Sequence, residues 1–159
     1  MTIIRNPKPI DSQAIRFIAE ATGWLSVHSN YMYWLCTTIY SPRSFVACDS
    51  NDGVIGYLLS IPGHHFGTEF LLQIGVHPLH QNKYIGIKLL SSHWKWMQKQ
   101  KIRTVQTSVN SSCVPGQRLL RIARLRLGHN YMQINWASDS LQLVPFAQEE
   151  LLYEAQVEA

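Results

Sequence analysis

The stretch that most constrains the fold is an apolar run followed by a short polar loop and an amphipathic segment. Residues 69–76 (EFLLQIGV) form the run, which is typical of a central strand covered on both faces. A polar loop follows at 77–82, and residues 85–99 have apolar side chains at helical spacing. A helix that starts directly after a central strand presents free backbone N–H groups to an anion. The stretch therefore predicts a strand–loop–helix unit able to hold a pyrophosphate.

Periodicity and turn residues predict the other elements. Strands are expected at 2–6, 44–48, 54–61, 102–109, 130–136 and 150–156, and helices at 12–22, 30–40 and 117–127. Asp11 or Ser12 is expected to cap the helix at 12–22. A hairpin is expected at 51–53, and Gly128 is placed to end the last helix. The order β, α, α, β, β, β, α, β, α, β, β predicts an α+β fold around a mixed sheet.

Length and composition favour a single globular domain over residues 1–159, because 46% of the residues are hydrophobic and only 15% are charged. The uncharged run at 23–41 is interrupted by polar residues, so it does not predict a transmembrane helix. The first residues carry no apolar secretory signal. The three cysteines, Cys36, Cys48 and Cys113, have neither disulfide-framework nor zinc-ligand spacing, so we expect no metal and a reducing cytoplasm.

The charge balance is mildly basic, with a formal net charge of +4 and a pI near 9.1. This balance allows an anionic partner such as a phosphorylated cofactor, an acidic protein or a nucleic acid, and it does not choose among them. The sequence contains no recognised nucleic-acid-binding motif, which argues against the last of these.

Two segments near the central strand resemble a known superfamily. Residues 73–78 (QIGVHP) and 81–86 (QNKYIG), with the order of elements, resemble the GNAT superfamily of acyl-CoA-dependent N-acyltransferases, whose motif here is Q/R-x-x-G-x-G/A. Tyr84 replaces the middle glycine; it can still donate its N–H, but its side chain crowds the loop. A strand–helix turn in another α/β protein is the alternative. The resemblance implies that Ile74, Gly75 and Val76 bind the pantetheine arm and that Gln81, Asn82, Lys83, Tyr84, Ile85, Gly86 and Ile87 face the pyrophosphate.

Residues 25–35 (LSVHSNYMYWL) resemble the L-D-x-N-S-x-Y-x-Y-L-L segment of the diaminobutyrate acetyltransferases of ectoine synthesis, a GNAT family. Residues 45–47 and 54–57 follow in matching order, and the tail at 149–153 is similar to the H-E-x-E-x-L-Y ending of that family. The resemblance spans residues 3–156. The resemblance implies a GNAT-like fold, with a mixed, mostly antiparallel central sheet flanked by helices. It also implies a transferase of a biosynthetic pathway that uses acetyl-CoA and a small amine acceptor. It implies a homodimer and no metal.

The departures from this family concern the acceptor. Ser26 replaces the acidic residue that helps to hold the diamine, and His28 replaces the asparagine. Leu72 stands where the family has a tryptophan, and Ala147 where the tail has a histidine. Of the substrate-facing pair in the tail, Glu150 remains. A cationic nitrogen needs an anionic partner, so these changes favour a related amine, or one already neutral at one end, over diaminobutyrate itself.

Acyl transfer to an amine requires removal of a proton from the ammonium group and support for the tetrahedral oxyanion. Glu150 is the first candidate base, directly or through a water, and His28 is the second; each is equally a candidate substrate anchor. Backbone N–H groups near residues 75–76 are expected to support the oxyanion. Arg124 stands where many superfamily members have a general-acid tyrosine, and an arginine side chain cannot serve as a general acid there. The acceptor pocket is expected to contain Ser26, His28, Tyr31, Leu72, Gln73 and Glu150.

A basic stripe at 118–126 leaves two further alternatives open. Arg118, Arg121 and Arg124 recur every three residues, with Arg126 close by. The stripe is either a solvated helix face or a contact for an anion, namely the 3′-phosphate of coenzyme A or an acidic carrier protein bearing phosphopantetheine. A donor held by a carrier protein would tolerate Tyr84, because it has no pyrophosphate in the loop. A non-catalytic binding module on the same fold is the remaining alternative.

Overall fold

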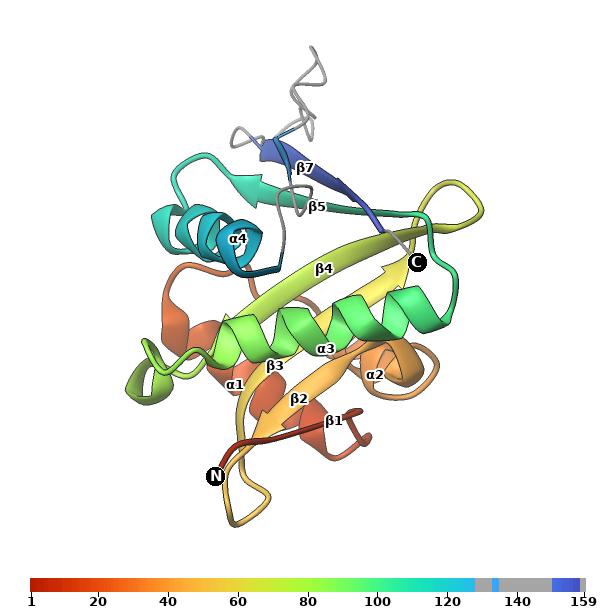
Figure 1. The fold of residues 1–159 in the computed structure, drawn as a ribbon. Helices are drawn as coiled ribbons and strands as arrows, with labels where there is room; N and C mark the ends of the chain where they lie inside the picture. The colour runs from red at the N-terminus through yellow and green to blue at the C-terminus, as the bar shows by residue number, and fades with distance from the viewer. Residues whose placement is uncertain (128–132, 135–149, 158–159) are drawn as a thin grey trace. The chain divides into compact units, whose positions relative to one another are not determined.

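The computed structural model describes residues 1–127, 133–134 and 150–157. Its helices are α1 (Asp11–Thr22), α2 (Asn30–Thr37), α3 (Ile85–Lys99) and α4 (Val114–Leu127), with 3₁₀ helices η1 (Ser41–Arg43) and η2 (Pro78–His80). Its strands are β1 (Ile3–Arg5), β2 (Phe45–Cys48), β3 (Val54–Pro62), β4 (Thr68–Val76), β5 (Thr104–Asn110), β6 (Gln133–Ile134) and β7 (Glu150–Gln156). The elements follow one another in the predicted order (Figure 1).

Hydrogen bonds join the strands in the order β1-β2-β3-β4-β5-β7-β6. The β4–β5 pair is parallel, whereas β1–β2, β2–β3, β5–β7 and β6–β7 are antiparallel. The predicted α+β class with a mixed, mostly antiparallel sheet is therefore confirmed. Within the described residues, no helix has the length and apolar character needed to cross a membrane.

The chain forms two compact units. Unit 1 contains residues 1–61 and 72–96, and unit 2 contains residues 62–71 and 97–159. Strand β4 and helix α3 each pass from one unit to the other along the chain. The single domain expected over residues 1–159 stays a prediction.

The core of unit 1 lies on both faces of β2 and β3. One face packs against α1 and α2 in a buried cluster of Ile15, Ile18, Ala19, Tyr33, Cys36, Val46, Cys48, Tyr57 and Leu59. The other face lies against α3, because a Cβ added at Gly56 would come within 3.0 Å of Ile85 and 3.5 Å of Leu89. In Figure 1, α3 accordingly crosses in front of β2 and β3, while α1 lies behind them.

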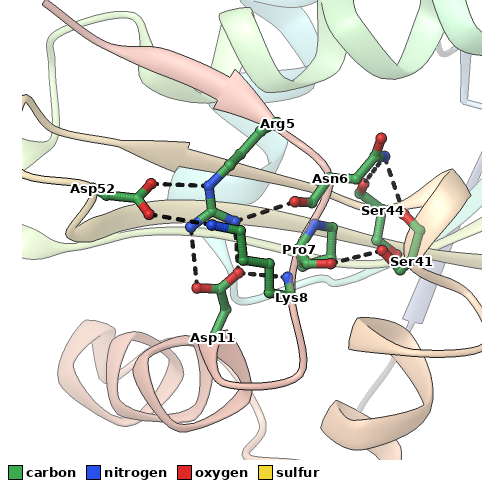
Figure 2. Close-up of polar contacts among 8 residues, drawn as sticks. All are labelled: Arg5, Asn6, Pro7, Lys8, Asp11, Ser41, Ser44 and Asp52. Atoms are coloured by element: carbon green, nitrogen blue, oxygen red, sulfur yellow. Dashed lines mark hydrogen bonds and ion pairs between the residues drawn. The ribbon is translucent and has the colours of Figure 1, made fainter.

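Arg5 is the centre of an ion-pair network that joins β1 to α1 and to the β2–β3 hairpin (Figure 2). Its guanidinium donates to both carboxylate oxygens of Asp11, at 2.7 and 3.2 Å, and its Nε donates to Asp52 at 3.0 Å. The backbone N–H of Lys8 also donates to Asp11 Oδ2, at 2.6 Å. Asp52 lies in the hairpin turn expected at 51–53 and has a positive φ of 61°. The network therefore fixes the N-terminal strand to two separate elements.

The expected cap of the first helix is wrong for a reason visible in this network. The residue that precedes α1 is Ile10, which makes no side-chain capping bond. The Asp11 carboxylate accepts from Arg5 and from the backbone of Lys8 instead, so it is not available to the helix N–H groups. Helix α2, in contrast, is capped by Ser29, whose hydroxyl accepts from the Met32 N–H at 3.2 Å.

Three other boundaries differ from the sequence expectations by two residues or more. Helix α2 ends at Thr37, where Thr38 leaves the helical conformation. Helix α4 begins at Val114, three residues before the expected start at residue 117. Pro115 is tolerated in the first turn, because the N–H groups there have no partner within the helix. Strand β5 begins at Thr104, because the chain after α3 first closes a Schellman motif. There the N–H of Lys101, at φ 58°, donates to Gln98 O.

Unit 2 is built on β5. Its parallel ladder with β4 ends at the pair Leu71–Thr107, where the Thr107 hydroxyl donates to Leu71 O at 2.8 Å. Its antiparallel ladder with β7 continues to Asn110, which pairs with Glu150. Helix α4 packs closely on β5, since a Cβ added at Gly116 would lie 3.1 Å from Val109 Cγ1. Gly128, Ala147, Glu149 and most of the strand expected at 130–136 lie outside the described residues.

Candidate active site

The loop between β4 and α3 is held by side chains that bond to its own backbone. β4 ends at Val76, whose carbonyl accepts from the Gln81 side-chain amide at 3.1 Å. The Lys83 ammonium donates to Leu79 O at 3.1 Å, inside the same loop. Gln81, the first residue of the expected motif, therefore closes the loop back onto the end of the strand.

Two residues of this loop adopt a left-handed conformation. Asn82 has a φ of 60° and Tyr84 a φ of 59°. Glycine adopts this conformation without cost, whereas other residues pay roughly 1–2 kcal/mol. Tyr84 thus stands in a backbone conformation that favours glycine, and its side chain is 57% exposed. The side chain differs from the motif, but the loop retains the backbone path that glycine would take.

This loop leads directly into α3. Tyr84 O accepts the helical N–H of Lys88 at 3.0 Å, so the N–H groups of the first turn, Ile85 to Ile87, precede the regular bonding of the helix. Such groups, with the positive end of the helix dipole and an exposed lysine at residue 83, favour an anion. Successive N–H groups in a left-handed turn add to this preference. The arrangement suits a diphosphate.

The end of β4 lies close to β3 because two glycines face each other. A Cβ added at Gly56 would lie 3.2 Å from Gly75 O, and one added at Gly75 would lie 2.8 Å from Tyr57 Cε1. Glycine is therefore required sterically at residue 75. The ring of Tyr57 occupies the space that a side chain there would fill, and this packing defines the backbone path at Ile74 to Val76.

Gln73 joins β4 to the segment that precedes α2. Its side-chain N–H donates to Ser26 O at 2.7 Å, and its Oε1 accepts from the hydroxyls of Tyr57 at 2.7 Å and Tyr33 at 3.4 Å. The Tyr33 oxygen accepts from the His28 N–H at 3.1 Å. Unit 1 therefore brings together three of the predicted acceptor residues: Ser26, His28 and Gln73.

His28 is the better described of the two candidate bases. Its side chain is half-buried, with its ring edge-on to Tyr33 at a centroid distance of 5.9 Å. Burial lowers the pKa of His28 below its usual value near 6.5. The imidazole is therefore neutral at pH 7 and able to accept a proton.

Two other predicted acceptor residues have different surroundings. Tyr31 is 66% exposed, and its ring stacks on Trp34 of the same helix at 5.8 Å. Leu72 is partly buried and packs against the cluster between α1, α2 and the sheet. Among the described residues, Tyr31 and Leu72 take no part in the hydrogen bonds that join Ser26 and His28 to Gln73.

Unit 2 contains the remaining candidates. Glu150 is the first residue of β7 and lies opposite Asn110 of β5. Arg118, Arg121 and Arg124 are exposed on α4. Burial raises the pKa of Tyr153, and the charge of Arg121 opposes this shift. Arg121 therefore lies on the side of α4 that approaches β7.

Sequence reasoning did not identify the roles of Tyr33 and Tyr57. Both lie in apolar segments and both are buried, at 1% and 0% exposure, so each hydroxyl requires a partner. The sequence signal was a glutamine in the middle of an apolar strand, which requires buried partners of its own.

Among the described residues, no group of three or more His, Cys, Asp or Glu side chains is placed to hold a metal ion.

The strand order, with a parallel β4–β5 pair and a turn leading into α3, defines the fold of the GNAT acetyltransferases. No protein-family model matches the sequence, and the search of curated proteins finds no match. The similarity to solved structures covers almost the whole chain at low sequence identity.

Diaminobutyrate acetyltransferase from Paenibacillus lautus, solved with L-2,4-diaminobutyric acid and coenzyme A, has a TM-score of 0.84 and 17% identity, covering 99% of this chain and 95% of that chain. Ard1 from Thermoplasma volcanium has a TM-score of 0.83 and 14% identity, with 99% of both chains covered. YncA of Salmonella typhimurium, a putative acetyltransferase solved with acetyl-CoA, has a TM-score of 0.73 and 20% identity, covering 99% of this chain and 94% of that chain. This chain therefore shares the GNAT fold.

Proposed function

We propose that this chain is an N-acyltransferase that moves an acetyl group from acetyl-CoA to the primary amine of a small, amino-acid-like acceptor. The observation that carries the proposal is the left-handed backbone at Asn82 and Tyr84, immediately before the first turn of α3. A backbone of this kind presents converging N–H groups to a diphosphate, and it occurs here although the motif glycine is absent.

The donor is proposed to lie along the end of β4 and the following loop. Ile74, Gly75 and Val76 lie beyond the last β4–β5 pair, at Leu71, so their backbone groups are the candidates for bonds to the pantetheine arm. The residues from Gln81 to Ile87 would bind the pyrophosphate through backbone N–H groups. Solved relatives of this fold that contain coenzyme A or acetyl-CoA support this assignment.

The reaction is direct attack. The neutral amine attacks the thioester carbonyl, the new C–N bond forms, and the C–S bond breaks as the thiolate leaves. The ammonium proton passes to Glu150 or His28, and a proton from solvent or the amine neutralises the thiolate. The lowered pKa of His28 keeps its imidazole in the basic form at neutral pH. The N–H groups near Gly75 are proposed to stabilise the oxyanion.

The acceptor is proposed to carry fewer positive charges than diaminobutyrate. Ser26 is exposed in the segment before α2, where its side chain offers a hydroxyl and no negative charge. The neighbouring His28 is neutral. A second ammonium group on the acceptor would therefore lose its ion-pair partner on this segment, whereas an acceptor with one amine would lose nothing.

A matched series of acceptors tests this function. Thiol release from acetyl-CoA should be measured with L-2,4-diaminobutyrate, with 4-aminobutyrate, which lacks the second amine, and with 1,3-diaminopropane, which lacks the carboxylate. We expect the highest kcat/KM with 4-aminobutyrate. Glu150→Gln and His28→Asn should lower kcat, whereas His64→Asn, at an exposed loop histidine, should not. Donor binding without turnover by any amine would instead indicate a binding module.

A carrier-protein donor is the second candidate, favoured by the charge of α4. Residues 104–127 contain no Asp or Glu, while Arg118 and Arg121 are exposed on the helix. An acidic carrier domain would complement this surface. Acetyl-phosphopantetheinyl carrier protein should then replace acetyl-CoA in the thiol assay, with an activity that falls in Arg118→Glu and in high salt. The control Lys95→Glu, on α3, should not change it.

Two general properties also remain predictions. The resemblance to diaminobutyrate acetyltransferases favours a homodimer, which light scattering on the purified chain would test. The cysteine content favours the cytoplasm, which fractionation of cells that express the chain would test.

A further inference from the structure

The segment between α1 and α2 is anchored to β4 at two points. Residues 23–29 contain no helix or strand, and they begin at Gly23, which has a φ of 69°. Ser26 O accepts from the Gln73 side chain at 2.7 Å. The His28 N–H donates to the Tyr33 oxygen, whose own O–H bonds to Gln73. Both anchors therefore lead to one side-chain amide.

The direction of each hydrogen bond is set by chemistry. A backbone carbonyl only accepts, so the Gln73 group that faces Ser26 is the NH₂, and its oxygen faces the two tyrosines. Tyr33 accepts from a backbone N–H, so its single proton is directed to Gln73. Turning the amide over would place two acceptors against each other at Ser26. Only one arrangement of protons satisfies the whole network.

The three side chains at the centre of the network are closed to solvent. Gln73 is 7% exposed, Tyr33 1% and Tyr57 0%. The Gln73 Oε1 already accepts hydrogen bonds from two hydroxyl groups, and a carbonyl oxygen has two lone pairs with which to accept. Removing the Tyr33 hydroxyl takes one of these bonds away and leaves the His28 N–H without its acceptor, which costs more than a hydrogen bond itself contributes. The Gln73 oxygen is therefore not available to a substrate.

We propose that Gln73 and Tyr33 are positioning residues, which set the affinity for the acceptor by holding Ser26 and His28 against β4. The predicted effect on acceptor affinity rests on the proposed function. The predicted anchoring of Ser26 and His28 does not. The positioning role replaces the expected role of Gln73 as a substrate contact. The second part of the proposal is that the hydroxyl of Tyr57, which bonds the same oxygen but neither Ser26 nor His28, contributes to stability and not to acceptor affinity.

The test compares Tyr33→Phe with Tyr57→Phe. Each variant removes one hydroxyl from the same amide oxygen and keeps the ring, so the two differ in whether the His28 N–H loses its acceptor. In Tyr33→Phe, hydrogen exchange of the His28 amide should become about tenfold faster or more, because one hydrogen bond is lost. In Tyr57→Phe, the exchange rate should change only as far as the lower global stability of the variant requires. Gln73→Met removes the donor to Ser26 O but leaves the Tyr33 hydroxyl as acceptor of the His28 N–H, so it should accelerate this exchange less than Tyr33→Phe does.

The kinetic readout uses 4-aminobutyrate as the probe acceptor. Tyr33→Phe and Gln73→Met should raise its KM about tenfold, with smaller changes in kcat and in the KM for acetyl-CoA. Tyr57→Phe should leave the acceptor KM unchanged although its hydrogen bond is the shorter one. Equal effects of both tyrosine variants on the acceptor KM would overturn the proposal, because they would indicate a purely structural network.

The two proposals fail in distinguishable ways. If the chain transfers no acetyl group, the exchange rate of the His28 amide still tests the anchoring. Unchanged exchange in a folded Tyr33→Phe would refute the anchoring even if the enzyme were active. If Gln73→Met does not fold, Gln73→Glu supplies a second variant, since in its carboxylate form the side chain can accept from both tyrosines but cannot donate to Ser26 O.

Discussion

Gly75 lies directly against the ring of Tyr57, so that a Cβ at residue 75 would come within 2.8 Å of Tyr57 Cε1. Gly75→Ala therefore requires the strand or the ring to move, at a cost of about 1–3 kcal/mol. Because the same backbone is the proposed site of the pantetheine arm, acetyl-CoA affinity should fall as well. Chemical denaturation and calorimetry measure the two effects. The double variant Gly75→Ala/Tyr57→Leu should regain part of the loss, and no regain would refute the steric account.

Tyr84 provides a test of the loop. Tyr84→Gly should stabilise the left-handed backbone by about 1 kcal/mol, less the entropy that glycine adds to the unfolded chain. It should also bind acetyl-CoA several-fold more tightly, since no side chain crowds the loop. Tyr84→Ala removes the ring but keeps the backbone cost, so it should improve affinity without improving stability. Weaker binding in both variants would show that the tyrosine ring contacts the donor.

The order of the elements could be predicted from the sequence because it depends on local signals. The period of apolar residues distinguishes helices from strands, and Asn51, Gly53 and Pro62 mark the turns between them. The boundaries were less accurate where an interaction with a distant residue decides them. Asp11 does not cap α1, because Arg5 and Lys8 bind its carboxylate.

The candidate site was predictable only where a contiguous motif defines it. The loop from Gln81 to Gly86 is proposed from its resemblance to a motif, and its binding role stays a prediction. The left-handed φ of Tyr84 follows from the folded backbone and has no side-chain signal. The bonds from Gln73 to Tyr33 and Tyr57 join residues 40 and 16 positions apart. Such pairings depend on sheet register, which periodicity does not specify.

His93 gives the fold a defined pH dependence. Its ring is completely buried between Phe45 and Trp96, with its Nε2 3.1 Å from Ser60 Oγ, and its Nδ1 has no hydrogen-bond partner among the described residues. Burial, with a smaller contribution from the charge of Arg43, lowers the pKa of His93 to about 3.

Between pH 3 and its usual value near 6.5, the unfolded state binds a proton that the folded state excludes. Stability should therefore fall as the pH decreases from about 6.5, by up to about 1.4 kcal/mol per pH unit from this group. Urea denaturation at pH 7, 6 and 5 measures the slope. His93→Leu should lose this component, whereas the exposed His64→Gln should retain it. The same slope in His93→Leu would assign it to other groups.

The network in Figure 2 predicts unequal roles for two aspartates. Asp11→Ala removes the bidentate partner of the partly buried Arg5 and should destabilise the fold by about 1–3 kcal/mol. Asp52 is exposed and makes single contacts, so Asp52→Ala should have a much smaller effect. Denaturation midpoints in low and high salt compare the variants. Equal losses would contradict this ranking, because they would show that the hairpin contact of Arg5 contributes as much as its contact with α1.

The central claim is that the loop from Gln81 to Ile87 binds the diphosphate of acetyl-CoA although Tyr84 replaces a glycine. Calorimetric titration of the purified chain with acetyl-CoA tests it most directly. We predict saturable one-site binding with a dissociation constant of about 1–100 μM, the range usual for enzyme substrates. The absence of binding at millimolar acetyl-CoA would contradict the claim and leave a carrier-protein donor or a binding module as the remaining functions.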